Sequence, residues 1–140
     1  MNVLFDTNIV LDVLLGREPF CTPAAQLFSY VESGTVAGYL CATTLTTVYY
    51  LAAKAAGRGT ANEQVEQLLQ LFDVTPVNRL VLEAALKLNS PDFEDAVLVA
   101  SAHHSGMNGI VTRNPKDFKN SPVPVHTPDE LLKILDDAGA

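Results

Sequence analysis

Near its start the sequence places an acid directly after a short apolar run, Val3-Leu4-Phe5-Asp6, and a helical pattern follows at once. An apolar run without polar alternation is typical of a strand that is buried on both faces of a parallel sheet. Ligands of open parallel sheets bind at the carboxyl ends of the strands, so Asp6 is a candidate site residue. A second interpretation is that Asp6 or Thr7 simply caps the next helix, because Asp and Thr are good N-caps.

Strands and helices alternate along the rest of the sequence, with short turns between them. Further strands are expected at 37–41, 73–77, 109–112 and 125–126, and helices at 8–15, 24–32, 79–88, 92–104 and 129–135, with a helical hairpin around Gly57. Thr60 is the expected cap of the second hairpin helix, and Ser90 the expected cap of the helix at 92–104. The alternation predicts an α/β fold, a three-layer α/β/α sandwich with a mostly parallel central sheet, and one domain over residues 1–140.

Composition limits the class of protein. The 140 residues suffice for one domain, no apolar segment reaches the roughly 18 residues of a membrane span, and no signal peptide is recognisable. Cys21 and Cys41 are too few for a disulfide framework or a zinc site, so we expect a cytoplasmic protein with reduced thiols. The net charge of −7 argues against a generic nucleic-acid binder, unless several acids surround a cation that reverses the local potential.

Three acids open the helix expected at 92–104, in the segment Ser90-Pro91-Asp92-Phe93-Glu94-Asp95. Acids in a first turn interact favourably with the helix dipole, by about 0.3–1 kcal/mol each, and this suffices to explain Glu94, which we assign to solvent. Asp92 and Asp95 are three residues apart, share one helix face and repel each other. Since the rest of the helix is apolar, this acid pair exceeds what capping requires.

A third polar segment, Val111-Thr112-Arg113-Asn114-Pro115-Lys116-Asp117-Phe118, follows the strand expected at 109–112. By itself it reads as an ordinary loop, because Asn and Asp favour turns. In a parallel sheet, however, the carboxyl ends of the strands lie at one edge, so acids from all three segments are expected to converge there. Mg²⁺ and Mn²⁺ prefer oxygen ligands, and carboxylates in particular. The sequence therefore predicts a Mg²⁺ or Mn²⁺ site with Asp6, Asp92, Asp95 and Asp117 as candidate ligands.

The sequence resembles the PIN-domain nucleases, which include the toxins of bacterial VapBC-type toxin–antitoxin pairs. The resemblance spans nearly the whole chain and rests on three segments in register: 6–12 (DTNIVLD), 95–102 (DAVLVASA) and 111–118 (VTRNPKDF). It implies a sheet of about five strands and a Mg²⁺- or Mn²⁺-dependent endoribonuclease, with RNA as substrate, an antitoxin protein as partner and a homodimer as assembly. The implied catalytic residues are Asp6, Asp95 and an acid after the fourth strand, for which Asp117 is the candidate.

The sequence departs from the family pattern at two positions. Where members commonly carry an acid directly after Thr-Arg, this chain has Asn114, and Asp117 lies three positions later. PIN domains also place a Glu in the helix after the second strand, at or near Thr47, but residues 39–54 contain no acid. Asp92 is a candidate replacement from another helix.

The expected substrate-binding residues are Arg113, Lys116, Asn8 and Asn114. Arg113 and Lys116 would steer the RNA backbone, although plain solvated charges are an alternative interpretation. Two other functions stay open. One is a catalytically weak or inactive PIN fold that binds nucleic acid or protein, which the missing Glu favours. The other is a phosphatase of the haloacid-dehalogenase type with Asp6 as nucleophile, in which Asn8 stands where a second Asp is needed.

The apolar stretch 48–53 and the mean hydropathy of +0.17 also predict that the chain self-associates. Two-fold dimers are the commonest assembly of soluble chains. The apolar pattern and the family resemblance therefore lead to the same expectation, a homodimer.

Overall fold

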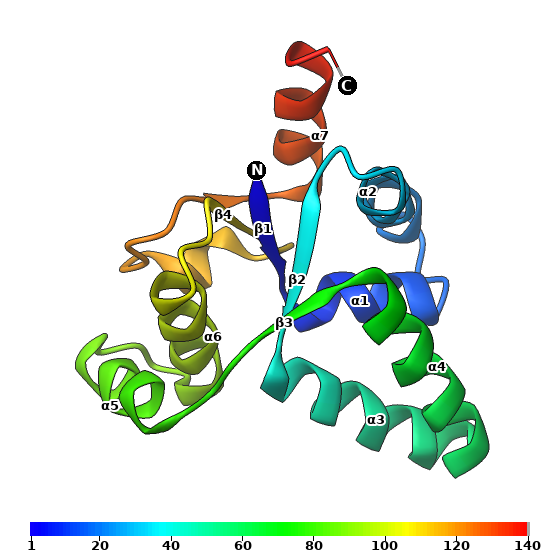
Figure 1. Cartoon of the computed structure of the whole chain (residues 1–140), viewed down its shortest axis with the longest axis horizontal. Coiled ribbons are helices and arrows are strands. Elements are labelled where there is room, and N and C mark those ends of the chain that lie inside the picture. The colour runs from blue at the N-terminus through cyan, green and yellow to red at the C-terminus, as the bar shows by residue number, and fades with distance from the viewer. Residues whose placement is uncertain (140) are drawn as a thin grey trace.

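The computed structural model of the protein describes residues 1–139. A sheet of five parallel strands forms its centre, with helices around it (Figure 1). The strands lie in the order β3-β2-β1-β4-β5, and every neighbouring pair is parallel. Leu4 of β1 is opposite Tyr39 of β2 and Ile110 of β4. Their bounds are β1 (Asn2–Phe5), β2 (Ala37–Cys41), β3 (Asp73–Thr75), β4 (Gly109–Val111) and β5 (Val125–His126). The expected parallel sheet of about five strands is confirmed.

Helices cover both faces of the sheet, because successive residues of its central strands point to opposite sides. Val3 and Phe5 of β1 pack into one core, and Leu4 packs into another with residues of α6. Figure 1 shows α1 to α4 on one side of the sheet and α5 and α6 on the other. The expected α/β/α sandwich is confirmed. The helices are α1 (Thr7–Leu14), α2 (Cys21–Glu32), α3 (Ala42–Ala56), α4 (Arg58–Leu71), α5 (Arg79–Lys87), α6 (Phe93–His104) and α7 (Pro128–Asp137).

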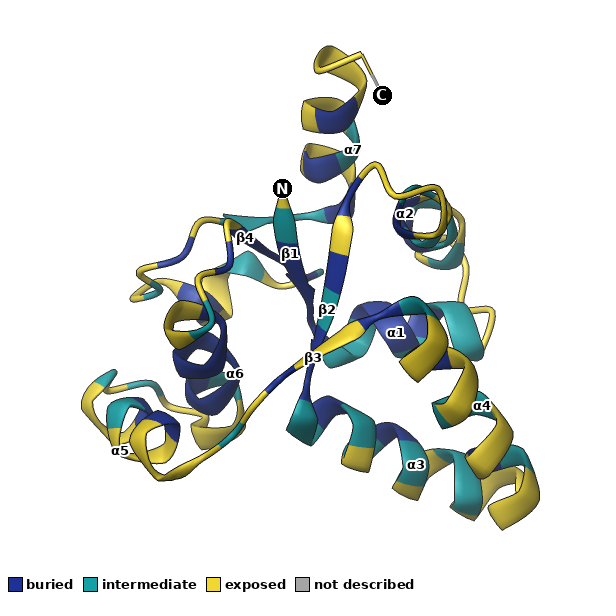
Figure 2. Ribbon diagram, viewed as in Figure 1, coloured by how far each residue is buried: buried dark blue, intermediate teal, exposed yellow. Residues whose placement is uncertain are grey.

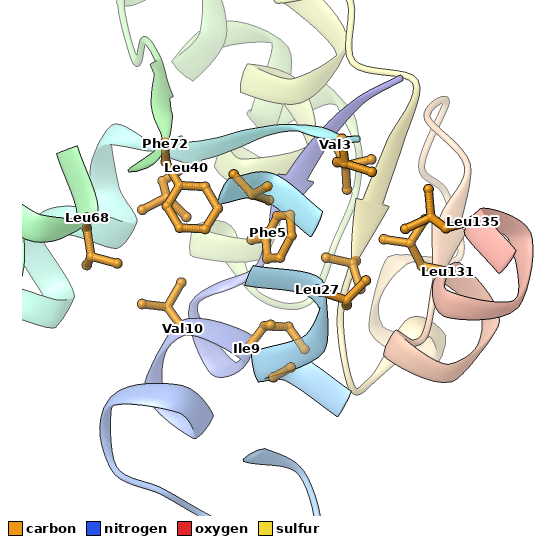
Figure 3. Packing of buried hydrophobic residues seen from close by; sticks show 14 of the residues in the cluster. Val3, Phe5, Ile9, Val10, Leu27, Leu40, Leu68, Phe72, Leu131 and Leu135 are labelled. Atoms are coloured by element: carbon orange, nitrogen blue, oxygen red, sulfur yellow. The ribbon is translucent and has the colours of Figure 1, made fainter. Parts of the chain in front are cut away.

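Three phenylalanines from separate elements meet in the larger core. The ring centroids of Phe5 and Phe28 are 5.9 Å apart, and Phe72 lies 5.1 Å from each of them, all edge to face. Figure 3 shows Phe5 and Phe72 surrounded by aliphatic side chains from strands and helices. The Phe72 ring also lies against the backbone of β2, where a Cβ added to Gly38 would be only 2.8 Å from it. The aromatic cluster therefore requires glycine at position 38.

Helix α6 is buried on almost every side (Figure 2). Residues 96–102 are all buried, because the sheet packs against one side of the helix and α5 against the other. Ser101 adds a polar connection: its Oγ lies 2.7 Å from Oγ1 of Thr75 and 2.8 Å from the carbonyl oxygen of Pro76. These contacts fix α6 relative to β3.

Two predicted helix caps are wrong, each for a local reason. α4 already begins at Arg58, because Gly57 (φ +91°) makes the break by itself, and Thr60 lies inside the helix. α6 begins at Phe93 with Asp92 as its N-cap, since the Asp92 carboxylate accepts a hydrogen bond from the backbone N–H of Asp95. Ser90 therefore lies before the cap. The polar loop after β4 also contains a short 3-10 helix, η1 (Pro115–Phe118), which the sequence did not predict.

The strand order reverses at β1, and this positions the candidate site. The chain leaves β1 toward β2 on one side, while β4 pairs with β1 on the other side. At such a switch point the loops after the two strands diverge and leave a crevice at their carboxyl ends. Asp6 follows β1 and Thr112 follows β4 at this edge. The start of α6 reaches it too, because α6 leads into the opposite end of β4.

Within residues 1–139, no helix combines the length and the apolar character needed to cross a bilayer.

Candidate functional site

Asp6 ends β1 and is buried, with 8% of its surface exposed. Its backbone N–H donates to the carbonyl oxygen of Val111 at 2.9 Å, so the pairing of β1 with β4 continues to this residue. Its Oδ1 accepts a hydrogen bond from the Thr7 N–H and its Oδ2 accepts one from the Thr112 hydroxyl, both at 2.7 Å. Asp6 is the N-cap of α1, as the second interpretation predicted, and it also lines the crevice at the switch point.

The crevice is a pocket of about 340 Å³ that is lined by acidic side chains from distant parts of the sequence. The acids predicted from the sequence come together here, and the two predicted asparagines join them. Glu94 is exposed, as expected, but it also lines the pocket, a position that the sequence analysis missed. The acidic and amide residues of this acidic pocket are Asp6, Asn8, Asp92, Glu94, Asp95, Asn114 and Asp117.

The crowded negative charge raises the pKa of two of these acids. Burial raises the pKa of Asp95, and the charges of Asp92, Asp6, Asp117 and Glu94 raise it further, to about 7. Burial likewise raises the pKa of Asp6, with smaller contributions from Glu94 and Asp117, while hydrogen bonds from Thr112 and Thr7 act in the opposite direction. Perturbed carboxylates gathered in a crevice are typical of functional sites.

Arg113 lines the acidic pocket, but its Nε faces a different carboxylate. Asp12 of α1 is completely buried. Its Oδ2 lies 2.7 Å from Nε of Arg113, and its Oδ1 lies 2.9 Å from Nε of Arg17. The guanidinium carbon of Arg113 stacks 4.2 Å from the centre of the Phe20 ring. Arg113 is therefore held at the pocket by α1 and by the turn that follows it.

The other predicted substrate-binding residues have distinct environments. Lys116 is exposed and lines an adjacent pocket of about 300 Å³ that also touches Asp95 and Asp117. The Asn8 side-chain amide donates to Oγ1 of Thr112 at 3.4 Å, and the backbone N–H of Asn114 donates to the same oxygen at 3.2 Å. Thr112 thus connects Asp6, Asn8 and Asn114 at the end of β4.

Thr47 stands on α3, at the position where the resemblance implies an acid. Its hydroxyl donates to Oε1 of Glu94 at 3.3 Å, across the gap between α3 and α6. Sequence reasoning missed this pair because 47 residues separate its members. The signal that was available is the place of Glu94 in the first turn of α6, at the same edge of the sheet as the start of α3.

The donor chemistry of the acidic pocket fits a hard divalent cation, because carboxylate and amide oxygens are its preferred ligands. Oδ1 of Asn8 is buried and has no hydrogen-bond partner among the described residues, so it is a further oxygen open to a ligand. Within residues 1–139, however, no three His, Cys, Asp or Glu side chains are close enough to hold one ion. Exposed Asp92 and Asp117 would have to turn inward, which the mutual repulsion of the acids opposes until a cation compensates it.

Comparison with known proteins agrees with this geometry. A family model described as PIN domain matches residues 2–116, a range that contains every acid of the pocket except Asp117. No curated protein sequence matches the chain significantly.

Several solved structures share the fold. A toxin–antitoxin complex from Klebsiella pneumoniae has a chain 26% identical to this one, with a TM-score of 0.70 over 90% of this chain and 97% of that one. FitAcB from Neisseria gonorrhoeae is 21% identical, with a TM-score of 0.72 over 90% and 97%. A sarcin-ricin-loop-cleaving VapC toxin from Mycobacterium tuberculosis is 15% identical, with a TM-score of 0.62 over 77% and 86%. The last two similarities concern the fold alone.

Proposed function

The chain belongs to the PIN-domain family, and from this premise we propose that it is a metal-dependent endoribonuclease of the VapC-like toxin type. The observation that carries the proposal is the acidic pocket, which buried Asp6 lines together with Asp95 and Asp117 at the carboxyl end of the sheet. A pocket with this excess of negative charge repels a phosphate backbone unless a cation is bound. Metal-dependent hydrolysis explains both the acids and the family membership.

We assign Asp6, Asp95 and Asp117 to the catalytic centre, with Asp92 as a further ligand. A divalent cation held by these carboxylates would activate a water for attack on the phosphodiester and neutralise the charge that develops on the phosphate. Asp6 is suited to a fixed ligand because two hydrogen bonds orient its carboxylate. Arg113, Lys116, Asn8 and Asn114 border the acids and would position the RNA.

RNA as the substrate is the finer part of the proposal. One protein of the same fold, 15% identical to this chain, is described as cleaving the sarcin-ricin loop, and this supports RNA as the substrate. Held by Asp12 and stacked on Phe20, Arg113 presents a cation at the pocket wall in a restrained position. A restrained arginine suits contact with a phosphate.

An antitoxin partner is proposed from the Klebsiella pneumoniae complex together with one surface feature. An apolar pocket of about 350 Å³ lies between α1, α3 and α4, lined among others by Leu11, Leu14, Val48 and Leu51. An apolar pocket beside an acidic one suits a protein segment that buries aliphatic side chains.

The direct test is cleavage of an end-labelled single-stranded RNA in Mn²⁺, in Mg²⁺ and in EDTA. We expect cleavage in Mn²⁺, less in Mg²⁺ and none in EDTA, because Mg²⁺ demands near-ideal octahedral geometry and the acids of this pocket are not drawn together. Asp6→Asn should abolish cleavage with an unchanged circular dichroism spectrum, since Asn keeps the N-cap but loses the charge. Asp73→Asn, an exposed acid on β3, is the matched control and should cleave like the wild type.

The same variants distinguish a toxin from a housekeeping nuclease. Expression of the wild-type chain alone in a bacterial host should arrest growth, and Asp6→Asn should relieve the arrest. Cleavage that persists in EDTA or in Asp6→Asn would come from a contaminant and leave the proposal without support.

A PIN fold that binds nucleic acid without cutting it is the second candidate. It is favoured by one observation, the absence of any acid from residues 39–54, which include the start of α3. RNA binding without cleavage under Mn²⁺ or Mg²⁺ would establish this function instead.

A further inference from the structure

The wall that α3 contributes to the acidic pocket carries hydroxyl groups and no acid. Thr43 lines the pocket, Thr44 is buried with its Oγ1 2.9 Å from Oγ1 of Thr7, and Thr47 faces α6 through its contact with Glu94. Hydroxyls are weaker cation ligands than carboxylates, so this side of the pocket would be left without a charged donor if Glu94 did not reach it.

Glu94 is not required for the local structure of α6. Capping of this helix is done by Asp92, whose Oδ1 accepts the Asp95 N–H at 3.1 Å. Asp95, which is half-buried, points into the pocket with Asp6. Glu94, which directly precedes Asp95, instead turns its carboxylate toward α3, where the hydroxyl of Thr47 donates to Oε1.

Glu94 is also electrostatically part of the pocket. Its charge contributes to the raised pKa of both Asp6 and Asp95. A glutamate that served only solubility or the helix dipole would gain by pointing away from these acids. Its orientation toward Thr47 keeps the carboxylate beside them.

We propose that Glu94 supplies the acidic pocket with its carboxylate on the α3 side, and that Thr47 is the positioning residue that holds it there for a divalent cation. This inference rests on the proposed function, because it names a further ligand of the same site. Among residues 1–139, Oδ1 of Asn8 in the same pocket has no hydrogen-bond partner, so it is a further oxygen that a cation or a hydrogen-bond donor could occupy.

The test is Mn²⁺ binding to the metal-free full chain, measured by the loss of the free Mn²⁺ signal in electron paramagnetic resonance. Wild type should bind and Asp6→Asn should not. Glu94→Gln should weaken binding about tenfold or more, in the range seen when groups that support a metal site are removed. Glu66→Gln makes the same chemical change at an exposed helical glutamate of α4 and should bind like wild type.

Two further variants test the contact with Thr47. Thr47→Val removes the hydroxyl and keeps the side-chain shape, so it should weaken binding by a smaller factor than Glu94→Gln. Moving the carboxylate to the other side of the contact, in the double variant Thr47→Glu with Glu94→Gln, should restore most of the affinity. A double variant as weak as Glu94→Gln would overturn the assignment of the carboxylate to this contact.

Melting temperatures separate a ligand from a merely structural glutamate. If Glu94 binds the cation, Glu94→Gln should leave the melting temperature in EDTA unchanged or higher, because one repulsive charge is lost, and should reduce the rise caused by Mn²⁺. If it served only α6, the variant would melt lower in EDTA and keep the full rise, which would refute the proposal.

The outcomes also separate this inference from the proposed function. Normal Mn²⁺ binding by Glu94→Gln beside lost binding by Asp6→Asn would refute the role of Glu94 alone. Failure of the wild type to bind Mn²⁺ would remove the proposed function and this inference with it.

Discussion

Two arginines converge on the buried carboxylate of Asp12, one from the turn after α1 and one from the loop after β4. The pairing ties the end of β4 to α1, and so fixes Arg113 beside the acidic pocket. Its members are remote in the sequence, so reasoning from segments could identify Arg113 as a cation near the site but not its partner. The position of Asp6 at the edge of the sheet was predictable, because the end of a strand and the cap of a helix coincide at this residue.

The raised pKa of Asp95 makes the stability of the metal-free protein depend on pH. Its pKa rises from 3.8 to about 7 through burial and through the charges of Asp92, Asp6, Asp117 and Glu94. Between these values the folded chain holds a proton that the unfolded chain releases, so this contribution to stability is present at the acidic end and is lost as the pH rises through about 7.

We therefore expect the urea midpoint of the wild type in EDTA to fall, relative to that of Asp95→Asn, as the pH increases from about 5 to about 8, because Asn carries no titrating charge. Asp73→Asn, far from the pocket, should follow the wild type. Parallel curves for wild type and Asp95→Asn would contradict the raised pKa.

At the scale of elements, hydrophobic periodicity predicted the strands and helices well, because most of them bury one continuous face. The wrong predictions concern the starts of two helices, each of which is determined by a single residue. Gly57 alone breaks the hairpin between α3 and α4, and Asp92 rather than Ser90 caps α6 because its side chain reaches the Asp95 N–H. Candidate caps one or two residues apart look alike in a sequence, and only the backbone conformation selects one.

Packing between elements produces a prediction at Gly38 of β2. A Cβ there would lie 2.8 Å from two carbons of the Phe72 ring and 2.8 Å from Cγ2 of Val31, and the ring is held by Phe5 and Phe28. Gly38→Ala should therefore cost about 1–3 kcal/mol of unfolding free energy, measured by urea denaturation.

Gly59→Ala is the control within the same chain. Gly59 lies in α4, and apart from its chain neighbours and the backbone of its own helix no atom of residues 1–139 lies within 4 Å of an added Cβ. The change should therefore be neutral or stabilise the protein by up to about 1 kcal/mol. Equal unfolding free energies of Gly38→Ala and Gly59→Ala would contradict this prediction and would show that the Phe72 ring can shift away from position 38 at little cost.

At the scale of the whole molecule, the parallel sheet and its two helical layers followed from the alternation of elements. The strand order did not follow from it, because no local sequence pattern indicates that β4 pairs with β1 rather than with β3. That order is what brings Asp6 beside Thr112 and the start of α6 to the same crevice. The common location of the acids was predictable from the rule that parallel strands end at one edge of the sheet. The residues that contact each acid within the pocket were not predictable, because these contacts join segments that are distant in the sequence.

Self-association is a prediction for the whole chain. Helix α3 exposes Tyr50 (63%) and Leu51 (40%) within the apolar stretch 48–53. Light scattering should give twice the chain mass of 15.0 kDa at micromolar concentration, and Tyr50→Lys should give the monomer. Leu86→Lys, at an exposed leucine of α5, should stay dimeric. A wild-type mass of 15.0 kDa would refute the dimer, and a monomer from Leu86→Lys alone would place the interface on α5.

The late position of β4 has a consequence during synthesis. Domains fold progressively as the chain emerges, but β4 (Gly109–Val111) must pair with β1 before the Asp6 carboxylate receives its hydrogen bond from Thr112. Asp117 follows later still. A ribosome-bound chain shorter than this has β1, β2 and β3 but an unfinished pocket. The order of residues along the chain thus delays the assembled pocket until residues 109–117 have left the ribosome, which would keep the proposed nuclease inert beside the RNA of the ribosome that makes it.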